Sequence, residues 1–178
     1  LYFQDSIKSQ HLPQASIDDA TLKLAGMCCD SRTAVITDDQ AVQYLGDALN
    51  SQHLPQVSKD TAAFRLAWMR YDSRTSVIDD DQAVQYFQQT LNSKHLHQGL
   101  KDDAARKLAL MCCANRTTVI ADDQAVQYLG QALNSHYLHQ DLKDDTFLKL
   151  AWMCFKNRTT VITNDQAARS LGHIVYSS

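Results

Sequence analysis

The sequence Asp-Asp-Gln-Ala-Val-Gln-Tyr occupies residues 38–44 and recurs unchanged at 80–86 and 122–128. A weaker copy, Asn-Asp-Gln-Ala-Ala, begins at residue 164, so the step between copies is always 42 residues. A fixed period of this length is typical of proteins built from stacked helical units. The chain is therefore predicted to be a repeat protein, whose surface and not a single pocket decides its function.

Composition excludes several classes of protein. The 178 residues are 44% hydrophobic, enough for a core, and the net charge of -3 provides no overall attraction to nucleic acid or anionic lipid. The apolar runs are short and interrupted by charge, which argues against a membrane span or a secretory leader. The five cysteines have neither disulfide-framework nor zinc-site spacing, so we expect packing roles in a reducing, cytoplasmic-type compartment.

The period divides the chain into segments. Residues 1–4, Leu-Tyr-Phe-Gln, resemble the tail of a protease-cleavage tag, but they also align with the end of a first helix one period later, and both interpretations stay open. The predicted segments are a partial first repeat, three repeats and a partial final repeat, at residues 5–37, 38–79, 80–121, 122–163 and 164–178. This division predicts a monomeric fragment of a longer array.

Each repeat is predicted to hold two helices and a connector. The first helix begins at the repeated motif, where Thr37 and Gln40 form a capping box and apolar residues such as Val42 and Leu45 have helical spacing. The second helix begins near Ser16, Ser58, Leu100 and Leu142 and carries the pattern Lys/Arg-Leu-Ala-x-Met. The connector Arg-Thr-x-Val-Ile favours a short extended crossing, with Val and Ile filling the gap between units. The predicted fold is an all-α, right-handed α-solenoid.

The 42-residue helical repeat with Leu-Ala-x-Met in its second helix resembles the HEAT and armadillo class of α-helical repeat proteins. Its near-constant period is also similar to that of the SKWP-type repeat effectors of plant-pathogenic bacteria, although this chain lacks the Ser-Lys-Trp-Pro signature. The resemblance to the first group implies a scaffold. The resemblance to the second implies a virulence protein that a bacterium secretes into host cells, where it binds host proteins.

No catalytic motif is evident. The sequence has no glycine-rich phosphate loop, nucleophile elbow or His-Glu-x-x-His, and the paired Asp residues recur in every repeat, as helix caps do and catalytic dyads do not. Histidines such as His53, His95 and His97 recur in register, but neighbouring layers are about 10 Å apart, too far for one metal ion to bridge. We therefore expect a protein that is not an enzyme and has no cofactor or metal.

Two charged columns recur with the period. The basic column is Arg32, Arg74, Arg116 and Arg158, and the acidic column is Asp39, Asp81, Asp123 and Asp165. One interpretation is a structural ladder in which each Arg pairs with an Asp and locks one repeat to the next. The other is a track of cations that binds phosphate or an acidic partner.

The most variable positions lie on one stripe of the second helix, at spacings i, i+4 and i+7 on the side opposite the constant Leu. The candidate partner-binding residues on this stripe are Phe64, Trp68, Tyr71, Arg106, Leu110, Leu148, Trp152 and Phe155. Aromatic residues that vary between repeats are typical of a surface that binds another protein. The alternative is that the stripe packs against the next repeat.

The predicted function is a non-enzymatic scaffold that binds a protein along one face of a helical array. The alternative is a single-stranded nucleic-acid-binding repeat protein that selects one base per repeat. The acidic balance of the chain argues against this alternative, and nothing in the sequence indicates membrane binding.

Overall fold

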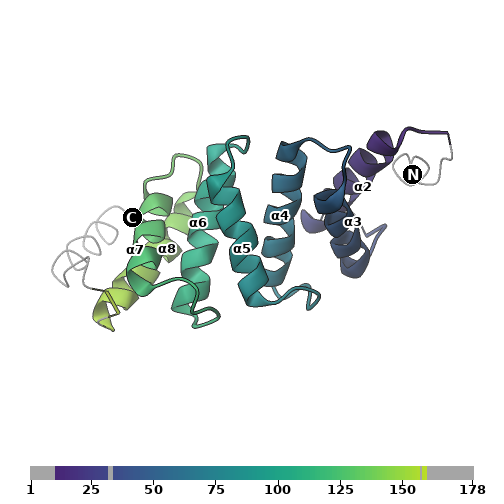
Figure 1. The fold of residues 1–178 in the computed structure, drawn as a ribbon. Coiled ribbons are helices and arrows are strands. Elements are labelled where there is room, and N and C mark those ends of the chain that lie inside the picture. Colours follow the sequence, from purple (N-terminus) through teal and green to yellow (C-terminus); the bar gives the residue numbers. More distant parts are fainter. Residues whose placement is uncertain (1–10, 32–33, 157, 160–178) are drawn as a thin grey trace. The chain divides into compact units, whose positions relative to one another are not determined.

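The structure, a computed structural model, describes residues 11–31, 34–156 and 158–159. Within these ranges all regular structure is helical, in seven helices that follow one another along the chain (Figure 1). They are α2 (Gln14–Cys29), α3 (Asp38–Asn50), α4 (Gln56–Tyr71), α5 (Asp80–Asn92), α6 (Gln98–Cys113), α7 (Asp122–Leu133) and α8 (Gln140–Phe155). The predicted all-α class is confirmed. Arg32, Asp165 and the segments 1–4 and 164–178 lie outside the described residues.

The helices group into two compact units, one containing α2 to α5 and the other α6 to α8. Inside each unit a long helix packs against the short helix that follows it and against the next long helix. The constant Leu and Met of the repeated pattern are buried in both units, for example Leu66 and Met69 in α4 and Leu108 and Met111 in α6. The repeated residues therefore build the core of each unit.

Side chains cap two of the short helices. Thr37 Oγ1 accepts a bond from the Gln40 backbone N–H at 3.2 Å, and Gln40 Oε1 accepts one from the Thr37 N–H at 3.0 Å, as predicted. Asp79 and Gln82 form the same capping box before α5. Ala121 occupies this position before α7 and has no side chain able to cap. The starts at Asp38, Asp80 and Asp122 reproduce the 42-residue step.

The long helices begin two residues earlier than predicted, directly after Pro13, Pro55, His97 and His139. The prediction took the acidic residue of each copy as the mark of the first turn. Instead, the Pro55 carbonyl accepts the Ser58 and Lys59 N–H groups, so the helix begins at the turn itself. Asp60 consequently lies a full turn inside α4, and it is buried.

The described residues of the connectors form no strand, and of the Val and Ile that were predicted to fill the gap between units only Ile is buried. Ile36, Ile78 and Ile120 are buried, as predicted. The neighbouring Val35, Val77 and Val119 are exposed, with Val77 at 67%, so the prediction is wrong for Val. Adjacent residues of an irregular segment point to opposite sides, and the pattern could not show which of the two faces the core.

The long helices α2, α4 and α6 each end in a turn with a left-handed residue, Ser31, Ser73 and Asn115. Ser73 has a φ of 59°, its N–H bonds to the Arg70 carbonyl at 3.0 Å, and the Arg74 N–H bonds to the Met69 carbonyl at 2.8 Å. This pair of bonds is the Schellman motif, in which Gly is the preferred left-handed residue. Asn115 and Arg116 repeat the arrangement after α6, with a φ of 54° at Asn115.

We expect Ser73→Gly to raise the free energy of unfolding by about 0.5–1 kcal/mol, because Gly adopts this conformation without strain and the gain exceeds its entropic cost. Urea denaturation followed by circular dichroism measures the change. Ser76→Gly, in the same connector but without a positive φ, is the matched control and should not stabilise the protein. Equal effects of the two substitutions would contradict the assignment.

Candidate functional site

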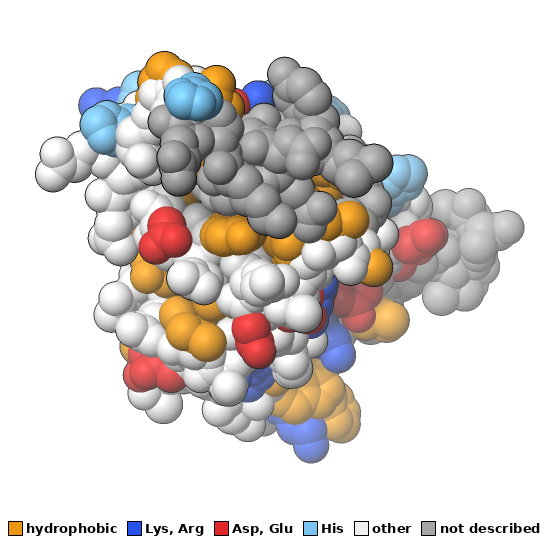
Figure 2. Space-filling view, turned by 90° about the vertical axis from the view of Figure 1, so that its right-hand side faces the viewer, with side chains coloured by type: hydrophobic (Ala, Val, Ile, Leu, Met, Phe, Trp, Pro, Cys, Tyr) orange, Lys and Arg blue, Asp and Glu red, His pale blue; other side chains and the backbone are white. Residues whose placement is uncertain are grey.

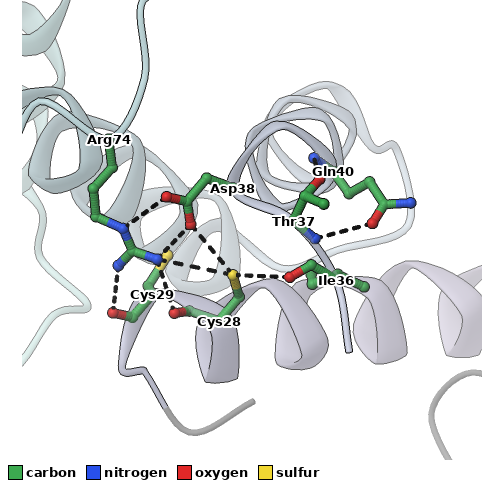
Figure 3. Close-up of polar contacts among 7 residues, drawn as sticks. All are labelled: Cys28, Cys29, Ile36, Thr37, Asp38, Gln40 and Arg74. Carbon is green, nitrogen blue, oxygen red and sulfur yellow. Dashed lines mark hydrogen bonds and ion pairs between the residues drawn. The ribbon is translucent and has the colours of Figure 1, made fainter. Parts of the chain in front are cut away.

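Arg74 joins three segments of the first unit (Figure 3). Its Nε and Nη2 donate to the two carboxylate oxygens of Asp38, at the start of α3. Its Nη1 donates to the Cys29 carbonyl at 2.9 Å and its Nη2 to the Cys28 carbonyl at 3.2 Å, at the end of α2. One guanidinium therefore satisfies two terminal carbonyls of one helix and a carboxylate of the next.

The second unit repeats this arrangement. Arg158 Nε donates to Asp122 Oδ2 at 2.9 Å, and Nη1 and Nη2 donate to the Cys113 and Cys112 carbonyls, both at 3.2 Å. We call each set of contacts, Arg74 with Asp38, Cys28 and Cys29, and Arg158 with Asp122, Cys112 and Cys113, an arginine clamp. The clamp leaves Arg74 and Arg158 engaged with acidic and carbonyl oxygens of the chain itself.

The acidic partners in the clamps lie one residue before the column that the sequence analysis selected. Asp38 and Asp122 bind the arginines, whereas Asp39 is exposed and Asp123 accepts a bond from Thr159 Oγ1 at 2.8 Å. Consecutive helical residues differ by about 100° in direction, so only the first Asp of each pair faces the preceding long helix. Because both residues of each pair are Asp, the sequence does not show which of the two binds the arginine.

The cysteines beside the clamps are buried and free. Cys28 Sγ lies 3.6 Å from the Ile36 carbonyl and 3.6 Å from Asp38 Oδ1, and Cys112 Sγ lies 3.3 Å from Asp122 Oδ1. Burial, with a hydrogen bond to the nearby carboxylate, raises the pKa of Cys112 to about 12, and burial raises that of Cys29 to about 11. These thiols stay protonated at neutral pH, so they lack the character of nucleophiles or metal ligands.

A buried carboxylate ties α4 to the turn after α5, and an equivalent one ties α6 to the turn after α7. Asp60 accepts bonds from Ser93 Oγ, from Gln56 Nε2 at 2.8 Å and from Gln89 Nε2 at 3.0 Å. Burial acts to raise the pKa of Asp60, but these hydrogen bonds outweigh it and hold the pKa below its ordinary value. Asp102 has the same partners in the second unit. The signal in the sequence is the constant distance from each Asp to the following Ser.

The described residues contain no group of three or more His, Cys, Asp or Glu side chains arranged to hold a metal ion. None of the described helices is long and apolar enough to span a bilayer. On the face drawn in Figure 2, acidic side chains are scattered among polar ones and histidines lie along its upper part.

The candidate partner-binding stripe differs in exposure from helix to helix. Phe64, Arg106 and Leu110 are buried, and Phe64 packs edge-on against Phe87 at 6.1 Å between ring centroids. Trp68 and Tyr71 are half-buried. The three stripe residues of α8 are all exposed, Leu148 at 59%, Trp152 at 39% and Phe155 at 76%. A partner could reach the buried residues only if the helices separated.

The positions of α2 equivalent to the stripe are Leu22, Gly26 and Cys29, and their contacts show why the stripe is buried in other helices. Leu22 and Cys29 are buried, α4 packs against α2, and the Arg65 guanidinium lies where a side chain on Gly26 would project. In the second unit, α8 packs against α6 in the same way. The stripe is therefore an interface between successive long helices in α2 and α6, and an open apolar surface only on α8, among the described residues.

No protein-family model, curated protein or solved structure matches this chain. The function proposed for this site therefore rests on the geometry of the site alone.

We expect Arg74→Ala to lower the free energy of unfolding by about 2 kcal/mol, because Asp38 loses its ion pair, the Cys29 carbonyl loses its donor and the Cys28 carbonyl keeps only the Ser31 N–H. Arg74→Lys should recover little of this loss, since an ammonium cannot bind four oxygens in the geometry of a guanidinium. Chemical denaturation of both variants measures the effect, with Lys94→Ala as the control for loss of an exposed cation. Full stability of Arg74→Lys would show that charge alone suffices.

The lowered pKa of Asp60 predicts a pH dependence. The carboxylate stabilises the fold fully above the ordinary Asp pKa of 3.8 and loses this contribution as the pH falls through its lower folded-state pKa. Asp60→Asn should therefore be less stable than the unchanged chain at neutral pH, and the difference should shrink as the pH falls below 3.8. Urea denaturation across this range tests it, with Asp72→Asn as the control for loss of one exposed acid. A difference that stays constant would contradict the assignment.

Proposed function

We propose that this chain is a non-enzymatic helical-repeat scaffold that binds another protein through the apolar surface of α8. We call this surface, Leu148, Trp152 and Phe155, the α8 stripe. We further propose that the helix pairs stack as a right-handed α-solenoid of the HEAT and armadillo class. The constant 42-residue step and the packing of long helix on long helix inside both units support that arrangement.

The exposure of the α8 stripe carries the proposal. Three large apolar side chains at i, i+4 and i+7 lie on one side of a helix, and the most exposed of them, Phe155, leaves 76% of its surface accessible. Contiguous exposed apolar surface of this kind is typical of interaction sites, and Trp contributes much of the binding energy at such sites. The same positions are buried in α2 and α6, so the stripe is suited to contact with another element.

The charges of the described residues support a protein partner over the nucleic-acid alternative. Arg74 and Arg158, two of the four cations that could have formed a phosphate track, are engaged by Asp38 and Asp122. Nucleic-acid affinity depends on cations available to phosphates. The exposed stripe offers apolar contact area instead.

We extend the proposal to the cell in which the chain acts, because its repeat period is similar to that of the SKWP-type repeat effectors. Under this extension the chain is part of a bacterial protein delivered into host cells, where its partner is a host protein. Five cysteines that are free and buried are compatible with a reducing compartment of that kind.

The test compares proteins captured from a plant-cell lysate by the unchanged chain and by the double variant Leu148→Ser with Phe155→Ser. Both substituted side chains are exposed, so circular dichroism should show an intact fold. Val77→Ser, which replaces an exposed apolar residue in a connector, is the matched control. We expect specific partners to be depleted at least about tenfold with the double variant only, equivalent to about 1.4 kcal/mol.

Two outcomes would contradict the proposed function. One is an identical set of captured proteins for the unchanged chain and the double variant. The other is retention of single-stranded RNA at low salt that weakens steeply as salt rises, which would favour the nucleic-acid alternative.

A further inference from the structure

The two tryptophans of the chain both lie against an arginine of a clamp. The guanidinium carbon of Arg74 lies 5.8 Å from the ring centroid of Trp68, and that of Arg158 lies 5.5 Å from the ring centroid of Trp152. At these distances a guanidinium over an aromatic ring is attracted by the electrons of the ring. Each clamp therefore contains an aromatic contact as well as its hydrogen bonds.

The indole and the oxygen atoms use different parts of the same guanidinium. Asp38 and the carbonyls of Cys28 and Cys29 accept four hydrogen bonds from the N–H groups of Arg74, which lie in the plane of the guanidinium. The faces of that plane carry no donors, so an aromatic ring packs there without competing for a hydrogen bond. Trp68 is thus suited to hold the guanidinium in the orientation that the four bonds require.

The position of each Trp in its repeat corresponds to the clamp that it contacts. Each of the two Trp residues precedes its clamp arginine by six residues. Gly26 and Leu110 occupy the same position in α2 and α6, and neither offers an aromatic face. The alternation along the chain therefore places one Trp in each compact unit, beside the clamp described in that unit.

A shared exposure does not account for the two Trp residues. Trp152 is exposed at 39% and belongs to the α8 stripe, whereas Trp68 is half-buried. The feature that they share is the contact with a clamp arginine. These arginines are mostly covered, with side-chain exposures of 23% for Arg74 and 21% for Arg158. A contact between a cation and a ring becomes stronger as water is excluded from the cation.

We propose that Trp68 and Trp152 are positioning residues of the arginine clamps. Each indole holds its guanidinium against the end of the preceding long helix, α2 or α6, and so determines how readily that helix end opens. This inference goes beyond the proposed function, because it assigns Trp152 a role inside the chain that needs no partner. Without the indole, Arg74 has more conformations available and its bonds to α2 break more often. The last turn of α2 then opens more often than the rest of the chain.

The test measures hydrogen exchange of backbone amides by mass spectrometry in the whole chain carrying Trp68→Leu or Trp152→Leu. Leu occupies this position in α6, so both variants should fold. We expect Trp68→Leu to speed exchange in the last turn of α2 by about two- to fivefold, the range of an exposed cation–π contact, and to leave α6 unchanged. Trp152→Leu should speed exchange in the last turn of α6 and leave α2 unchanged. Each variant is therefore the matched control of the other.

Two further variants separate the contact with the arginine from the loss of a large side chain. Trp68→Phe keeps an aromatic face, so it should restore part of the protection that Trp68→Leu removes. In a chain that already carries Arg74→Ala, Trp68→Leu should change exchange in α2 by less than about twofold, because the contact that it removes is already absent.

An unchanged exchange rate in the last turns of α2 and α6, or equal acceleration in both by either variant, would overturn the inference. The same acceleration by Trp68→Leu with and without Arg74 would overturn it in favour of packing alone. Trp68→Phe carries the comparison if Trp68→Leu does not fold. The capture experiment replaces Leu148 and Phe155 and leaves both Trp residues in place, so its result and this one are independent.

Discussion

The arginine clamp is the contact on which the arrangement of helices in each unit depends. The last carbonyls of a helix have no partner inside it and lie at the negative end of its dipole. Arg74 supplies donors to two such carbonyls of α2 while the other edge of its guanidinium binds Asp38 of α3. Because Arg74 itself follows α4, one side chain fixes the end of one helix, the start of the next and the approach of a third.

The backbone geometry of the turn after α4 directs the Arg74 side chain toward α2. The left-handed Ser73 reverses the chain after α4, and the bond from the Arg74 N–H to the Met69 carbonyl holds the backbone of Arg74 at the helix end. The guanidinium then reaches back toward α2 with few conformations to lose. In the second unit the Arg158 N–H bonds to the Met153 carbonyl at 3.0 Å in the same way. A short-range motif thus determines a contact between residues 36 positions apart in the chain.

The sequence was sufficient to predict the helices because the copies repeat the same apolar spacing, and the same Asp-Asp-Gln opens each described short helix. The sequence was insufficient where two adjacent residues have the same chemical character, because it does not show which of the two side chains faces the interior. Asp38 and Asp39 both suit an ion pair, and Val77 and Ile78 both suit a core, yet only one of each pair faces inward. Asp60 was assigned to a helix start because acids favour that position, whereas two of its three partners come from the next helix and turn. Directions of single side chains depend on packing that periodicity does not contain.

The residues of the stripe differ between repeats because most of them pack against different neighbours. Variation between copies suggested a surface selected for its partner, but in α2 and α6 the stripe is interior, and its variation is matched by the helix that covers it. Gly26 is small where Arg65 is large, and Arg106 is basic where Asp145 is acidic. Pairwise matching lets each interface of a repeat protein differ while the constant core keeps the helices in register. The residues that vary in α2 and α6 therefore reflect which helix each one meets.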